Sequence, residues 1–455
     1  MDIERARRPG GSVRTRVRGM IGTAAGLAVL AACGAPSSTR DVSAEAKAAC
    51  KVSVSSATTV NVLAMSAPAL DPFTDAMVKG CSGSKNLTVK HTPVDFTGQI
   101  QKAQLALSSK GASPYDLVEV YNGTLTEYAS KGWLVPLDDY IAKYRDTYKL
   151  DDIPDKTWKG FSYKGKVYGI PNQINSQVLI YRKDLFAKHG ITPPTTYDEL
   201  VSAAKKLKGD SGAKYPLAMV WGADDALADG FHGWLTTEGG SWFDGKGEPA
   251  FNSDKGVEAV ERMRGLMPYM PAEALTYNNG DVMALMQQGQ VAMTVIWASR
   301  AGSINDPDSS KVAGKVGFAP APAGAGDGVP TGEISQDGFA IAKNSAADPE
   351  TLFQIMASTT TDPAVMRKAA TLAIPSRDSV LEDRQAAQPH WPAAVQSIEH
   401  GATTLPGVPY MEPLTKTVIN PYLDKALTGR LPAKEALDQA AAELRRTLKA
   451  KGYLG

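Results

Sequence analysis

Short β-rich runs alternate with longer helical patterns through most of this 455-residue chain. The first strand-like runs lie at 59–65, 86–94 and 115–120, with helical patterns at 71–81 and 97–111 between them. This alternation indicates βαβ units, whose strands lie parallel in one sheet and whose helices cover it. About 400 residues exceed what one hydrophobic core normally supports, so we predict an α/β chain of two lobes.

Local start and stop signals mark several of the expected elements. In the segment 195–209, Thr196 is a suitable helix N-cap and Glu199 stands three residues later, as in a capping box. A further helix is expected over 281–289, followed by a strand over 291–296. These signals extend the alternating pattern into later parts of the chain.

The N-terminal segment has the pattern of a bacterial export signal. Six arginines precede an apolar run of twelve residues over 19–30. That run is too short for a membrane-spanning helix, which needs about 20 residues, but it suits the apolar part of a signal peptide. It ends in Leu30-Ala31-Ala32-Cys33-Gly34, which resembles a lipobox and implies cleavage before Cys33 and diacylation of its thiol.

We therefore expect residues 1–32 to be a lipoprotein signal peptide. Residues 33–57 are rich in Ser, Ala and Thr, and we expect them to form a flexible tether with a lipid anchor at Cys33. A small buried cysteine after a core helix is the alternative, which the arginines upstream and the polar residues downstream disfavour. The protein would then be exported and held at the outer face of the cytoplasmic membrane.

The charge balance changes when residues 1–32 are removed. Six arginines and two acidic residues leave the 49 basic and 48 acidic residues of the whole chain, so 43 and 46 remain. This small negative balance gives no general attraction to nucleic acid or to acidic membranes. No later stretch approaches 18 consecutive apolar residues, so the lipid would be the membrane anchor. We expect a monomer.

Two cysteines remain once Cys33 carries lipid. In an oxidising exported compartment, Cys50 and Cys81 are plausible disulfide partners. Two separate buried thiols are the alternative, and neither cysteine stands in a CxxC or Cys/His cluster typical of a metal site. We predict no metal site and no cofactor.

Motifs for catalysis are mostly absent. A P-loop-like spacing at Gly160, Gly165 and Lys166 continues with Val167 instead of Ser or Thr, and the segment 163–170 is typical of a hairpin. The sequence contains neither a GxSxG elbow nor histidines at ligand spacing. Spacing does not exclude the paired carboxylates of a glycoside hydrolase. The acidic residues that could meet in the fold are Glu119, Asp225, Asp244 and Glu333.

The segment Tyr168–Phe186 has a polar centre between apolar ends. Five uncharged polar side chains occupy six positions in it, namely Asn172, Gln173, Asn175, Ser176 and Gln177. Each would cost about 1–3 kcal/mol if it were buried without a hydrogen-bond partner. So many amides on one strand indicate that a ligand or the backbone supplies those partners.

Three tryptophans lie where a β-rich run gives way to a loop, and these are Trp221, Trp242 and Trp297. Ligands of open α/β sheets collect beyond the carboxyl ends of strands, so such side chains can reach a cleft. An indole covers the C–H surface of a sugar or polyol, while amides and carboxylates bond its hydroxyls. Ordinary core packing is the alternative for each tryptophan.

Four segments resemble the extracellular solute-binding proteins of sugar ABC transporters, of the maltose-binding-protein type. They are 113–141, 165–208, 283–297 and 372–383. The second is the most specific, with Tyr-Gly-Ile-Pro, a few variable contact residues, and then an aromatic residue before a Lys-Asp-Leu-Phe helix start. Arg182 departs from the family, in which Asn is usual at this position.

The resemblance implies two α/β lobes that are joined by a discontinuous hinge and close around a solute. Lobe 1 would comprise 58–171 plus 300–361, and lobe 2 would comprise 172–299 plus 362–455. The implied function is a non-catalytic receptor that binds a sugar or polyol and delivers it to the membrane-spanning subunits of an ABC permease.

The family pattern also implies a set of ligand contacts. The expected contacts, which include the three tryptophans, are Ser66, Tyr121, Asn122, Asn172, Gln173, Trp221, Trp242, Asp244, Trp297, Gln336, Asp337 and Arg377. Asn172 and Gln173 would lie at the first crossing and bond the solute, whereas Asn175 and Gln177 would bond the backbone or the lobe surface.

The expected cleft contains few cations, chiefly Arg377 with Arg300 as a second candidate. A neutral sugar or polyol is therefore expected before an anionic sugar derivative, such as a glycerophosphate or a sulfonated sugar. That order reverses if Arg377 faces the cleft without an acidic partner. A secreted glycoside hydrolase and a receptor for a peptide or metal chelate are the remaining alternatives.

Overall fold

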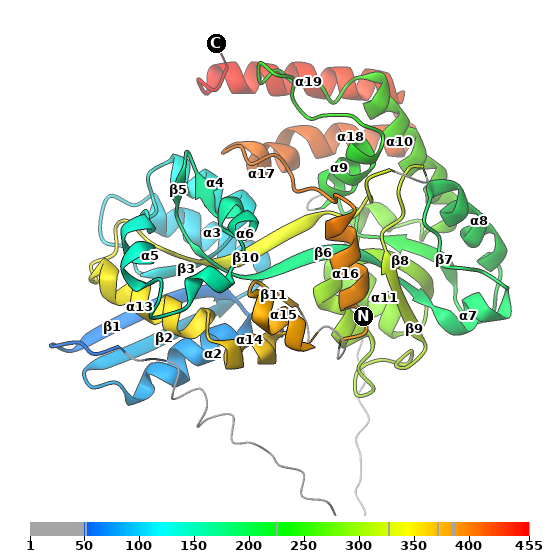
Figure 1. Cartoon of the computed structure of the whole chain (residues 1–455). Helices are drawn as coiled ribbons and strands as arrows, with labels where there is room; N and C mark the ends of the chain where they lie inside the picture. Colours follow the sequence, from blue (N-terminus) through cyan, green and yellow to red (C-terminus); the bar gives the residue numbers. More distant parts are fainter. Residues whose placement is uncertain are drawn as a thin grey trace, which may run out of the picture. The chain divides into compact units, whose positions relative to one another are not determined.

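Most strands of the computed structural model join one hydrogen-bonded sheet. The structure describes Cys50 and residues 52–223, 226–325, 328–370, 373–384 and 388–454. Within these residues the sheet contains β1 (Thr58–Met65), β2 (Leu87–Val94), β3 (Leu117–Tyr121), β6 (Ile170–Arg182), β7 (Tyr215–Met219), β8 (Val291–Trp297), β9 (Val316–Pro320), β10 (Ile334–Ile341) and β11 (Ile374–Pro375). Their order is β2-β1-β3-β10-β6-β8-β7, and β9 and β11 also pair with β6 (Figure 1).

Helices connect and flank these strands. They are α2 (Asp71–Gly80), α3 (Phe96–Leu107), α4 (Asn122–Ser130), α5 (Asp138–Tyr144), α6 (Asp155–Gly160), α7 (Lys183–Lys188), α8 (Tyr197–Leu207), α9 (Leu227–Thr237), α10 (Asp254–Leu266), α11 (Asn279–Gln287), α12 (Ala301–Ile304), α13 (Pro349–Thr360), α14 (Pro363–Ala369), α15 (Asp378–Arg384), α16 (Trp391–Glu399), α17 (Met411–Leu414), α18 (Asn420–Leu427) and α19 (Ala433–Ala450). The predicted alternation of strands and helices is confirmed, and β1 pairs in parallel with both β2 and β3.

The local signals predicted the helix and hairpin correctly, except that one helix begins two residues earlier than expected. Thr196 is the N-cap of α8, and its hydroxyl accepts a hydrogen bond from the Glu199 N–H at 3.3 Å. The helix predicted to begin at Asp281 instead begins at Asn279, because Asn278 is the N-cap. The Asp281 carboxylate accepts a hydrogen bond from the backbone N–H of Asn278. The predicted hairpin is present as β4 (Ser162–Tyr163) and β5 (Lys166–Val167).

The longest strand, β6, takes part in both halves of the sheet. Its thirteen residues pair with β10 from Ile170 to Ser176, and with β8 and β9 from Gln177 to Arg182. Strand β10 in turn pairs with β3. The polar centre of the segment Tyr168–Phe186 therefore lies where one half of the sheet meets the other.

The hydrophobic clusters favour later lobe crossings than those predicted from the sequence. Strand β9 and α12, expected in lobe 1, pack with Val178 and Ile180 of β6 in the other half. Helix α14, expected in lobe 2, packs on α2 beside Phe73. The boundaries 58–171 plus 300–361 and 172–299 plus 362–455 stay predictions, and we propose moving the second crossing to the start of β10 and the third to the segment between α15 and α16.

A disulfide joins Cys50 to Cys81, as predicted. It fastens the segment before β1 to the end of α2. No helix among the residues that the structure describes is both long and apolar enough to cross a membrane. Cys33, the signal peptide over 1–32 and most of the predicted tether lie outside the described residues.

Candidate ligand-binding site

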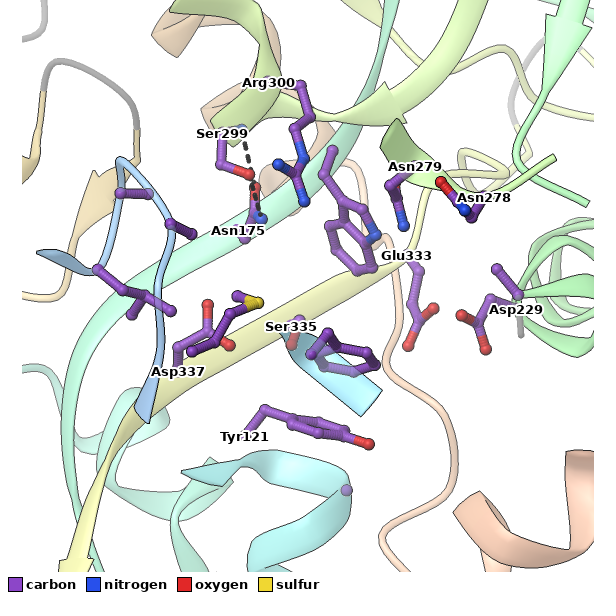
Figure 2. A pocket seen from close by; sticks show the side chains of 18 of the residues that line it. Tyr121, Asn175, Asp229, Asn278, Asn279, Ser299, Arg300, Glu333, Ser335 and Asp337 are labelled. Carbon is purple, nitrogen blue, oxygen red and sulfur yellow. Dashed lines mark hydrogen bonds between the residues drawn. The ribbon is translucent and has the colours of Figure 1, made fainter. Parts of the chain in front are cut away.

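A cavity of about 440 Å³ lies where several strands of the sheet end (Figure 2). Strands β1, β3 and β8 end at Met65, Tyr121 and Trp297, and all three residues line it. Its other walls come from β6, β10 and the segments that open α3, α4, α9, α11 and α17. This volume falls in the range of about 300–1,000 Å³ that is usual for small-molecule sites.

The structure brings five of the predicted contacts together around this cavity. They are Tyr121, Asn122, Gln173, Trp297 and Asp337. Tyr121 ends β3 and Asn122 begins α4, while Gln173 and Asp337 are partners on β6 and β10. Their role as ligand contacts stays a prediction.

Alternation along the strands excludes two further candidates from the cavity. Successive side chains of a strand point to opposite faces of a sheet, so adjacent residues seldom line the same cavity. Gln173 lines it, but its neighbour Asn172 is fully buried and does not. Asp337 lines it, but Gln336 faces a separate hollow beside Thr157. The expectation that both members of each pair contact the ligand is not supported.

Two of the predicted tryptophans pack in the core instead of the cavity. Trp221 and Trp242 are each 3% exposed and belong to the hydrophobic cluster of α9, α10 and α19. The indole N–H of Trp242 donates to His232 Nδ1 at 2.9 Å, so its polar group is already satisfied. The core-packing alternative therefore holds for these two residues.

The remaining predicted contacts also make bonds outside the cavity. Asp244 Oδ1 accepts from the backbone N–H groups of Lys246 and Glu248 in a turn. Ser66 lies beside the lining residues but is not one of them, and its hydroxyl donates to Asp71 Oδ1 at 3.2 Å. The sequence pattern had no means of separating these polar residues from true lining residues.

Arg377 makes structural contacts and does not line the cavity. It is 2% exposed, and its guanidinium donates to Asp152 Oδ2 at 3.1 Å and to the backbone carbonyl oxygens of Lys149 and Tyr148. The condition that would have favoured an anionic ligand, Arg377 in the cleft without an acidic partner, is therefore not met.

Several lining residues were missed or misassigned by the sequence reasoning. They include Asp229, Asn278, Asn279, Ser299, Glu333, Ser335 and Glu412. Asn175, which was expected to bond the backbone or the lobe surface, does accept from the Ser299 backbone N–H, and it also lines the cavity. The signal for Asn175, Ser335 and Glu333 is strand alternation, because Asn175 follows Gln173 by two positions, and Ser335 and Glu333 precede Asp337 by two and four positions. Asp229 and Glu412 come from helices and carry no such local signal.

Hydrogen bonds hold the amides of the cavity in place. Gln173 Nε2 donates to Asp337 Oδ2 at 3.0 Å, and Gln173 Oε1 is buried without a partner among the described residues. Asn175 Nδ2 donates to Ser299 Oγ at 3.0 Å, while its Oδ1 accepts from the Ser299 N–H at 3.2 Å (Figure 2). The first pair links β6 to β10, and the second links β6 to the segment after β8.

Negative charge dominates the lining. Asp95, Asp229, Glu333, Asp337 and Glu412 are acidic, whereas Arg300 is the single cation among the described residues that line the cavity. Loss of water on burial raises the pKa of Asp337 to about 6. Burial also raises the pKa of Glu333 well above its usual value, with further contributions from Asp229 and Glu412. Burial lowers the pKa of Arg300.

Glu119 supports one wall without lining the cavity. Its carboxylate accepts a hydrogen bond from the Met65 N–H at 2.5 Å, at the start of the lining segment 65–70. Burial raises the pKa of Glu119 to about 8. Within the described part of the chain, no group of three or more His, Cys, Asp or Glu side chains is arranged to hold a metal ion.

Comparison with known proteins identifies the family to which this fold belongs. Residues 73–360 match the family described as bacterial extracellular solute-binding protein. The chain belongs to this family. The solute-binding protein is 26% identical over 382 residues to a mannitol-binding protein of Pseudomonas aeruginosa, covering 78% of this chain and 84% of that protein.

Two further comparisons extend this result. A probable amino-acid ABC transporter periplasmic-binding protein of Sinorhizobium fredii is 22% identical over 388 residues, which cover 81% of this solute-binding protein and 84% of the relative. A solved ABC transporter solute-binding protein from Agrobacterium radiobacter K84, in complex with ribitol, superposes with a TM-score of 0.75 at 26% identity, covering 86% of this chain and 99% of that chain. The predicted two-lobed fold of a solute-binding protein is confirmed.

Proposed function

We propose that this solute-binding protein captures a sugar or polyol in the described cavity and delivers it to the membrane-spanning subunits of an ABC permease. The observation that carries the proposal is a set of buried polar atoms in the lining that have no hydrogen-bond partner among the residues that the structure describes. They are Tyr121 Oη, Gln173 Oε1 and Glu333 Oε2, and the indole of Trp297 lies in the same lining. A polyol offers hydroxyls that donate and accept, and C–H surface that an indole covers.

The family and its relatives support the same class of ligand. The mannitol-binding relative and the ribitol complex are each 26% identical to this chain, and both ligands are small neutral polyols. A linear polyol of this kind suits a cavity of about 440 Å³. Closure of the two lobes would then be driven by the contacts that the ligand makes with both.

Export and anchoring complete the proposal. The lipobox-like string at Cys33 would place a diacyl anchor at the N-terminus of the exported protein. The segment 33–57 would let the two lobes reach a permease at the outer face of the cytoplasmic membrane. This anchoring rests on the sequence.

The two other classes of ligand and reaction receive less support. An anionic sugar derivative would have to enter a lining with five acidic residues and one arginine. For a glycoside hydrolase, only Glu333 of the described candidate carboxylates lines the cavity, whereas Asp244 lies in a turn and Glu119 supports a wall. Asp225 lies outside the described residues.

A thermal-shift screen of the purified full chain tests the proposal. Mannitol, ribitol, hexoses, disaccharides, sugar phosphates and free amino acids would be compared, and bound solute would be recovered and identified by chromatography. A ligand at a hundred times its Kd adds about 2.7 kcal/mol to the apparent free energy of unfolding. A stabilising sugar or polyol that is recovered intact supports the proposal. Stabilisation by amino acids alone, or accumulation of hydrolysis products, refutes it.

A further inference from the structure

One end of the cavity gathers carboxylates from three separate elements. Glu333 immediately precedes β10, Asp229 lies in α9 and Glu412 lies in α17. Figure 2 shows the carboxylates of Glu333 and Asp229 turned toward each other across the cavity. Three residues that are far apart in the sequence thus create one acidic end of the cavity.

Glu333 is the most enclosed member of this group. It is 6% exposed, and its carboxylate accepts a hydrogen bond from the Leu405 N–H. Its Oε2 atom is buried and has no hydrogen-bond partner among the described residues. A buried carboxylate beside two others is unfavourable unless a proton or a cation balances its charge. Loss of water on burial, and after it the charges of Asp229 and Glu412, raises the pKa of Glu333.

The lining supplies no cation at this end. Arg300 is the single cation among the described lining residues, and Figure 2 shows it beside Asn175 and Ser299, away from Asp229. Lys416 pairs with Glu412 at 3.1 Å but does not line the cavity. No described lining residue therefore places a positive charge beside Glu333 Oε2, which leaves that atom open to a cationic group of the ligand.

We propose that the natural ligand is a polyol or sugar that carries a protonated amine, whose ammonium group binds between Glu333 and Asp229. This inference rests on the proposed function of the same cavity. An ammonium group has three donors and no acceptor, which matches ionised carboxylates, and its charge would favour the ionised form of Glu333. The hydroxyls of the ligand would bond the amides of Gln173 and Asn175. A metal ion is the less suitable cation, because no group of three ligating side chains is arranged to hold one in the described residues.

Matched pairs of ligands that differ in one group test the inference. Calorimetry on the full chain at pH 7 would compare sorbitol with 1-amino-1-deoxysorbitol, and glucose with glucosamine. We expect the amine to bind at least tenfold more tightly than the hydroxyl compound in at least one pair. The exchange Glu333→Gln keeps the shape of the side chain and removes its charge, so the preference for the amine should fall at least tenfold. Asp229→Asn provides a second variant if Glu333→Gln does not fold.

Controls separate this inference from the proposed function. Glu435→Gln changes an exposed carboxylate of α19 outside the cavity and should leave the preference intact. Equal or tighter binding of the neutral member of each pair overturns the inference but leaves the proposed function standing. A preference that survives both Glu333→Gln and Asp229→Asn also overturns it. Failure of every neutral and amine-bearing sugar or polyol to bind overturns the proposed function, and the inference with it.

Discussion

Replacing Gln173 with Ala should weaken ligand binding strongly, whereas the same change at the adjacent Asn172 should leave binding almost unchanged. The two amides are chemically alike and neighbours on β6, so they form a matched pair. Gln173 lines the cavity and donates to Asp337, while Asn172 is 0% exposed and points away from the lining. The sequence alone predicted equal roles for both.

The contacts of the two amides give the expected loss of ligand affinity in each variant. Gln173→Ala removes the 3.0 Å bond to Asp337 Oδ2 and the free acceptor Gln173 Oε1. Without Gln173 Oε1, a buried ligand hydroxyl would lose its acceptor, which costs about 1–3 kcal/mol, so affinity should fall roughly 5- to 150-fold. Asn172→Ala removes an amide whose two polar atoms have no partner in the described residues. It should change affinity less than about threefold.

Calorimetric titration of each full-length variant with the tightest sugar or polyol from the screen would measure these changes. A thermal melt of each variant first shows that it is folded. Equal losses of affinity in the two variants would mean that Asn172 contacts the ligand, and would refute the argument from strand alternation. A larger loss at Asn172 would refute it more strongly.

Three further predictions concern stability and spectroscopy. Reductant or Cys81→Ala should lower the free energy of unfolding by about 2–4 kcal/mol in urea, and reductant should not destabilise the Ala variant further. Because the pKa of Asp337 is raised to about 6, its protonated form favours folding, and this contribution is lost as pH rises from about 4 to 6. Asp337→Asn should therefore gain stability relative to the parent between pH 4 and pH 7, and a constant difference in urea denaturation would contradict this. Trp297→Phe should abolish most of the ligand-induced change in fluorescence, whereas Trp242→Phe should retain it, since only Trp297 lines the cavity.

Elements with strong local signals were predictable from the sequence. The strands β1, β2 and β3 and the N-cap Thr196 depend on period, propensity and capping within a few residues, so they match the structure closely. Lobe boundaries depend instead on which surfaces pack together. Strand β9 pairs with β6, and α14 packs on α2, through contacts that no short segment specifies.

The candidate site was predictable only in part, for reasons of geometry. The polar side chains of Gln173 and Asp337 made them candidates, but the residue type alone does not say which of two adjacent strand residues faces the cavity. The tryptophans show the same limit, because an indole after a strand packs in the core as readily as in a cleft, and Trp242 finds its partner in His232. Asp229 reaches the cavity from a helix whose position is set by tertiary packing.

The placement of the cavity against β6 has a consequence for the order of events in binding. Gln173 and Asn175 belong to β6, which pairs with both β10 and β8, so we expect the axis of a rotation between the two lobes to pass close to them. Points on a rotation axis move least, and the Gln173 bond to Asp337 should persist at every angle between the lobes. A solute would therefore bind Gln173 and Asn175 before the lobes close. Closure would then bring the more distant lining residues into contact and mainly slow dissociation. Substitutions along β6 should then alter the association rate, and substitutions at the outer wall should alter the dissociation rate.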